Sequence, residues 1–110
     1  MIFNKNTYLF ACLFLAKTLQ SQVVINEFSA ANWQQFTDNY GKAEDWLELY
    51  NPSNTAADLD GWWLSDKAST PQKWQFPAGT SIAPNGYLTV FCSKRNEAKN
   101  GFFHTNFSLT

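Results

Sequence analysis

The sequence predicts an all-β protein, an antiparallel β-sandwich built from short strands. Apolar and polar residues alternate in several short runs, which is the pattern of half-buried strands. Turns containing proline and glycine separate these runs at nearly regular spacing, as in antiparallel sandwiches. No run follows the helical period of 3.6 residues over a useful length, so helix-containing fold classes are excluded.

The two clearest strands lie in the first half of the chain. Residues 23–28 form a β-branched run whose polar residues come only at its end, and they predict the first strand. Residues 45–50 alternate, which places Leu47 and Leu49 on one face of a half-buried strand. Residues 29–42 lack a sustained period and predict a long loop.

The second half predicts short extended segments at 57–60, 62–65, 73–76, 79–82 and 87–91, with the start of another at 102–110. Gly61 interrupts the first pair of segments and indicates a β-bulge. Residues 84–86, Pro-Asn-Gly, form the strongest turn signal in the chain, because Asn and Gly tolerate positive φ. Residues 94–101 are polar and largely basic and predict a loop.

Residues 1–21 predict a cleavable signal peptide. Lys5 precedes an apolar run at 8–16 that is too short for the roughly 20 residues of a spanning helix. Weaker alternatives are a buried helix, a membrane anchor or a lipidated Cys12. Cleavage after Ser21 leaves Cys92 as the one cysteine of the domain at 22–110, so that domain forms no internal disulfide and Cys92 is expected to be a small buried hydrophobe.

The predicted mature chain is acidic. Residues 22–110 hold nine acidic residues against six lysines and arginines, a formal charge of −3. The acids gather in the first half and the bases in the second, which indicates separate acidic and basic regions. All five tryptophans also lie in this part and are expected mainly in the core, with a glycan-stacking platform as the alternative.

Three acidic residues are weak candidates for a metal site. Glu27, Asp45 and Glu48 could together offer Ca²⁺ the oxygen ligands that it prefers. Their spacing matches no loop with regular ligand positions, and solvated strand edges explain them better. We therefore expect no metal and no cofactor.

The basic loop is the candidate for contact with nucleic acid. Lys94, Arg95 and Lys99 are followed by Phe102 and Phe103, and positive charge beside aromatic rings suits phosphates and unpaired bases. The alternative is a solvated loop after a strand.

His104 is the single histidine, and the spacing places no acid–base pair around it. We therefore predict no catalytic residue and no enzyme activity.

A set of motifs in order resembles one known family. The motifs are Ile25-Asn26-Glu27, residues 45–52 (DWLELYNP), 59–66 (LDGWWLSD), 73–77 (KWQFP), 82–88 (IAPNGYL) and 104–109 (HTNFSL). In this order they resemble the lamin-tail domain in the form found in bacterial secreted proteins. The resemblance implies an immunoglobulin-like β-sandwich and a non-catalytic module. The sandwich of that family continues beyond the segment at 104–107, so the resemblance implies that the last strands are missing from this chain.

The expected function follows from the signal peptide and the resemblance. We expect a non-catalytic binding or scaffolding module of a secreted or cell-surface bacterial protein, without a transmembrane segment in the mature chain. Its loops would contact a protein, a glycan or a nucleic acid. The alternative is the N-terminal accessory domain of a larger exported nuclease, phosphatase or kinase-like enzyme whose catalytic part lies beyond residue 110.

Overall fold

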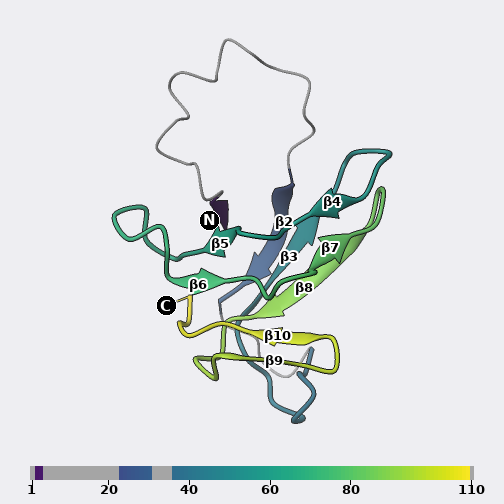
Figure 1. The fold of residues 1–110 in the computed structure, drawn as a ribbon. Coiled ribbons are helices and arrows are strands. Elements are labelled where there is room, and N and C mark those ends of the chain that lie inside the picture. Colours follow the sequence, from purple (N-terminus) through teal and green to yellow (C-terminus); the bar gives the residue numbers. More distant parts are fainter. Residues whose placement is uncertain (1, 4–22, 31–35, 110) are drawn as a thin grey trace.

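A computed structural model describes residues 2–3, 23–30 and 36–109 of the chain (Figure 1). These residues form ten strands and no helix. The strands are β1 (Ile2–Phe3), β2 (Val24–Ser29), β3 (Trp46–Tyr50), β4 (Ala57–Asp58), β5 (Trp63–Leu64), β6 (Trp74–Gln75), β7 (Ser81–Ile82), β8 (Tyr87–Phe91), β9 (Glu97–Lys99) and β10 (Phe102–His104).

The strands assemble into three sheets. The largest has the order β2-β3-β8-β10-β9, and smaller sheets have the orders β1-β5-β6 and β4-β7. Buried side chains of both the large and the small sheets share one core, among them Leu49, Leu64 and Ile82. The fold is the predicted all-β, immunoglobulin-like β-sandwich. None of the described segments is a helix that could cross a membrane.

One buried side chain joins the turns at one end of the sandwich. Asn51 is 1% exposed, and its amide nitrogen donates to the carbonyls of Thr55, Ile82 and Ala83 at 2.8–3.1 Å. The predicted turn at 84–86 is present, with Asn85 at φ 56° and the Gly86 N–H donating to the Ala83 carbonyl. Asn51 therefore links the turn after β3 to the turn before β8.

The structure differs from the sequence prediction at two places in the second half. Residues 97–99 lie in the predicted basic loop but form β9, an edge strand that pairs antiparallel with β10. Gly61 lies in a tight turn, with φ 80° and the Trp62 N–H donating to the Leu59 carbonyl, and the bulge falls instead in β2 between Ile25 and Glu27. Both features depend on which residues pair across neighbouring strands. The apolar–polar period of a single strand carries no information about that pairing.

Two further differences concern the pairing of strands. β10 pairs parallel with β8, so one contact of the large sheet departs from the antiparallel pattern. Residues 2–3, which belong to the predicted signal peptide, form β1 and pair antiparallel with β5. The rest of residues 1–21, with Cys12, lies outside the described residues, as does Trp33.

Candidate functional site

The large sheet has one face toward the core and one face away from it. Leu47 and Leu49 of β3 are buried in the core, so Trp46, Glu48 and Tyr50 lie on the opposite face. We call this opposite face of β2, β3, β8, β10 and β9 the outer face. Its side chains form rows across the strands, because residues in register on neighbouring strands lie side by side.

The first row is aromatic and open to solvent. Tyr50 lies between Val24 of β2 and Tyr87 of β8. The rings of Tyr50 and Tyr87 are stacked with their centroids 4.8 Å apart. Val24 is 44% and Tyr87 58% exposed, so this row presents apolar and aromatic surface to water.

The second row carries two carboxylates. Glu48 lies directly opposite Glu27 on one side and Thr89 on the other. Like charges in directly opposite positions destabilise a sheet. The side-chain nitrogen of Asn26 donates to Oε1 of Glu48 at 2.8 Å. Within the described part of the chain, the ion pairs join other residues, so neither glutamate is neutralised by a basic side chain there.

The far end of the outer face is covered by the segment at 36–42. The Phe36 ring stacks on Phe91 at 5.5 Å and meets Trp46 edge-on at 5.6 Å. The Tyr40 ring lies 5.8 Å from the His104 ring. The outer face is therefore closed over Phe91 and His104 and open over Tyr50 and Tyr87.

His104 is fully buried beneath this segment and both of its ring nitrogens have partners. Nε2 donates to Oδ1 of Asn39 at 2.7 Å, because an amide oxygen can only accept. Nδ1 then accepts from the Ser93 hydroxyl at 2.8 Å. This Ser–His–Asn order is also that of a hydrolytic triad, but here the ring is buried, stacks on Phe91 at 5.4 Å, and ties the 36–42 segment to the sheet.

Asp38 and Arg95 complete the attachment of the same segment. Oδ1 of Asp38 accepts the Tyr40 and Lys42 N–H groups at 2.8 and 2.9 Å. Its Oδ2 is buried 4.0 Å from Nε of Arg95, whose guanidinium lies 4.1 Å from the centroid of the Tyr40 ring. The Tyr40 hydroxyl donates to the Glu97 carboxylate, and this hydrogen bond, aided by burial, raises the pKa of Tyr40.

The structure separates the three residues predicted to contact nucleic acid. Arg95 is engaged with Tyr40 and Asp38. Lys94 is exposed in the connection between β8 and β9, and Lys99 lies on β9 opposite Phe102, which is 39% exposed. Of these three residues, Arg95 alone lies beside a carboxylate of the described part of the chain, while Lys94 and Lys99 form no ion pair there.

The weak metal candidates are only partly brought together. Glu27 and Glu48 are neighbours, but Oδ2 of Asp45 accepts the Leu109 N–H at 3.0 Å. Among the residues that the structure describes, no three His, Cys, Asp or Glu side chains are grouped to hold a metal ion.

The exposed aromatic surface is not the tryptophan platform considered above. Trp74 is buried, while Trp46, Trp62 and Trp63 are partly buried. The open pair is Tyr50 and Tyr87, which sequence reasoning missed. Antiparallel pairing of the two alternating runs at 45–50 and 87–91 would have revealed it.

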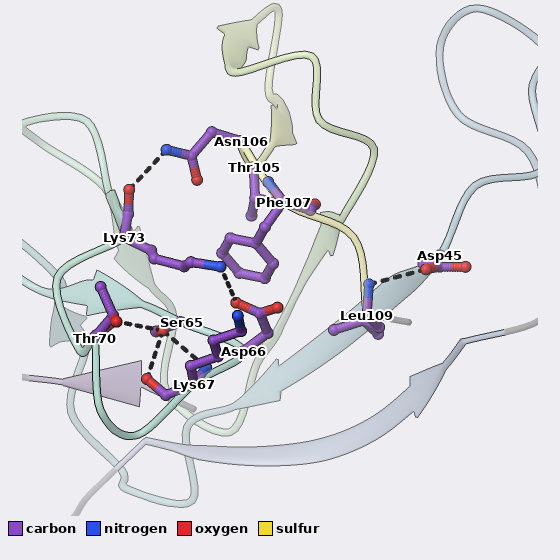
Figure 2. A network of polar contacts seen from close by, with 10 residues as sticks. All are labelled: Asp45, Ser65, Asp66, Lys67, Thr70, Lys73, Thr105, Asn106, Phe107 and Leu109. Carbon is purple, nitrogen blue, oxygen red and sulfur yellow. Dashed lines mark hydrogen bonds and ion pairs between the residues drawn. The ribbon is translucent and has the colours of Figure 1, made fainter.

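A second polar cluster fastens the C-terminal segment, and Figure 2 shows it. Nζ of Lys73 lies 2.6 Å from Oδ1 of Asp66 and 5.4 Å from the centroid of the Phe107 ring. The Asn106 amide donates to the Lys73 carbonyl at 2.8 Å. Burial is the largest single influence on Asp66 and disfavours its carboxylate, but the hydrogen bond from Lys73, a backbone hydrogen bond and the charges of Lys73 and Lys67 together outweigh it, so the pKa of Asp66 is lowered.

Fold and contacts together define the class of protein: an immunoglobulin-like sandwich whose polar clusters fasten its own segments and whose large sheet has an open face. The family model described as Lamin Tail Domain matches residues 16–110, so the chain belongs to this family, which is non-catalytic. The match begins within the predicted signal peptide. No curated protein and no solved structure matches the chain.

Proposed function

We propose that this chain is a non-catalytic binding module of a secreted or cell-surface bacterial protein. Membership of a non-catalytic family supports the binding role. The apolar run at 8–16 after Lys5 supports export, because it has the length and flanks of a signal peptide.

The open part of the outer face is the proposed binding surface, and its composition carries the proposal. Val24 and Tyr87 expose apolar and aromatic area, while Glu27 and Glu48 add two adjacent carboxylates. Aromatic rings and carboxylates together attract lysine and arginine side chains, by cation–π contact and by charge-assisted hydrogen bonds. The partner is therefore a basic segment of another protein.

The same surface is less suited to a nucleic acid or to a glycan. Glu27 and Glu48 would repel phosphate groups, which dominate the binding of nucleic acids. Tyr50 and Tyr87 stack on one another, so each ring has one face occupied and cannot offer it to a sugar.

Binding can be measured with a fluorescent peptide of alternating lysine and leucine. We expect the Glu27→Gln/Glu48→Gln double variant to bind about tenfold more weakly, since each charge pair near a surface contributes up to about 1 kcal/mol. Asp60→Asn removes a carboxylate of an exposed residue elsewhere and is the matched control. Equal loss in the control, or stronger binding of a single-stranded oligonucleotide than of the peptide, would refute this surface.

Export has its own test. The coding sequence expressed in a bacterial host should yield extracytoplasmic protein whose mass corresponds to a chain beginning at or near Gln22. A product that stays in the cytoplasm with residues 1–21 attached would contradict export and leave the binding test unaffected.

A further inference from the structure

β5 has a neighbouring strand on each side. β6 pairs with one edge, and β1 pairs antiparallel with the other, with Ile2 opposite Leu64 and Phe3 opposite Trp63. Figure 1 shows β1 beside β5, next to the N-terminus. Ile2 is partly buried against the core and Leu64 is completely buried. The edge of β5 thus accepts a short extended segment and gives one of its side chains a place against the core.

The segment seated on this edge comes from far away in the sequence and from a part of the chain that export would remove. Residues 2–3 lie in the predicted signal peptide, and cleavage after Ser21 takes β1 away. Cleavage would remove the strand that pairs with this edge of β5 and the Ile2 side chain that packs against the core there. Such an edge is a template for pairing with another extended chain.

We propose that the β1-facing edge of β5 is a strand-acceptor site and that in the exported protein it binds a short, extended, apolar segment of a partner protein. The segment runs antiparallel to β5 and carries a large aliphatic side chain opposite Leu64, as Ile2 does. Backbone hydrogen bonds supply affinity and the position beside Leu64 supplies selectivity. The proposal rests on the export half of the proposed function and concerns a surface other than the outer face.

The geometry favours a single partner strand over a second copy of this chain. β5 has two residues and follows directly on the turn from Leu59 to Trp62, so pairing two β5 edges would bring two whole sandwiches together side by side. The two edges of the large sheet are protected against pairing: β2 carries the bulge between Ile25 and Glu27, and β9 carries charged residues.

The test uses the full chain and a labelled synthetic peptide with the sequence of residues 1–8. Ile2→Asp should free the edge, because a carboxylate is not tolerated against the core, and Asn54→Asp adds the same charge at an exposed loop residue as a control. We expect Ile2→Asp to bind the peptide at least about tenfold more tightly than the unmodified or control chain, whose own segment competes at high effective concentration.

Backbone pairing has a separate readout. The Trp62 carbonyl accepts from the Phe76 N–H on the β6 side, so alternation along the strand directs the Trp63 N–H toward β1. Amide hydrogen exchange at Trp63 should be faster in Ile2→Asp and slow again when the peptide is added. A peptide with an N-methyl group at its third residue keeps the side chains but loses the donor that faces Trp63, and it should not bind. Unchanged exchange in Ile2→Asp, or equal binding of the methylated peptide, would show that β5 is no acceptor.

Two other outcomes identify a different occupant. If Ile2→Asp forms a dimer that excludes the peptide, the occupant is a second copy and the partner proposal is wrong. If the mass of the exported protein shows that residues 1–21 are retained, the chain's own N-terminus fills the edge, and the partner proposal falls even when the peptide binds. Failure of the outer-face peptide assay would affect neither result.

Discussion

Asn51 shows how much of this fold depends on a single polar side chain. Pro52 predicts that β3 ends in a turn, because proline restricts the residue before it. The reach of the Asn51 amide to Ile82 and Ala83, more than 30 residues away, depends on tertiary structure and could not be predicted. The turn could be predicted from local backbone chemistry, but the connection between turns could not.

Replacing Asn51 should destabilise the domain strongly. In Asn51→Asp a carboxylate would face the carbonyl oxygens of Thr55, Ile82 and Ala83, and we expect a loss of about 3 kcal/mol in the free energy of unfolding. Asn54→Ala, at an exposed position in the same turn, should change it by less than about 0.5 kcal/mol. Urea unfolding measures both, and a similar loss in the two variants would contradict the role of Asn51.

Cys92 is the second residue whose environment dictates its chemistry. It is 1% exposed, and burial raises the pKa of its thiol to about 12. Because the thiolate is the reactive form, folded protein that lacks residues 1–21, and with them Cys12, should not react with a disulfide reagent such as dithionitrobenzoate at pH 8. The single thiol of Cys92 should react after unfolding in urea, and rapid labelling of the native protein would contradict this burial.

The raised pKa of the Cys92 thiol also makes the stability of the domain depend on pH. The unfolded thiol ionises near pH 8.5, while the folded thiol stays protonated to about pH 12. The raised pKa means that unfolding releases a proton above pH 8.5, so the contribution of Cys92 to stability is complete below that value and is lost as pH rises toward 12. Cys92→Ala should therefore show a smaller fall in melting temperature between pH 8 and pH 10.5 than the unmodified chain.

At the level of elements, alternation predicts the longer strands well. Residues 45–50 and 87–91 became β3 and β8, because each presents one apolar face to the core. β9 was missed because Glu97, Ala98 and Lys99 are poor strand formers, and β10 and the turn at Asn100 and Gly101 hold them in the sheet. Tertiary context decides such edge strands.

The C-terminal segment is the element whose attachment depends most on charge. Lys73→Met removes the ion pair with Asp66 and the contact with Phe107, and should cost about 1 kcal/mol of unfolding free energy at pH 7. The lowered pKa of Asp66 means that this contribution exists above about pH 4 and is lost as pH falls below it.

The difference between Lys73→Met and the unmodified chain should therefore shrink at pH 2.5, as urea unfolding at both pH values would show. Lys99→Met, on an exposed edge residue, is the control and should show little difference at either pH. A constant difference for Lys73→Met would mean that packing on Phe107, and not charge, fastens the segment.

For the whole molecule, the fold class was predictable and the open part of the outer face was not. The sandwich follows from the repeated alternation and from the motifs shared with the lamin-tail domain. The open pair of Tyr50 and Tyr87 depends on which strands are neighbours and in which register, and the cover at 36–42 depends on packing between distant segments. Neither is encoded in the period of a single strand.

The parallel contact between β8 and β10 has a consequence for the order of assembly. β10 lies between β8 and β9, so after β8 the chain first forms the edge strand β9 and then returns as β10. The hairpin of β9 and β10 closes through a two-residue turn and can form early, while its attachment to β8 requires a longer loop to close. Pulse-labelled hydrogen exchange during refolding should protect the hairpin amides of Phe102 and Lys99 before the Thr105 amide, which donates to the Phe91 carbonyl. By the same argument β10 should join β8 before β3 does, because the chain between β8 and β10 is shorter than the chain between β3 and β8.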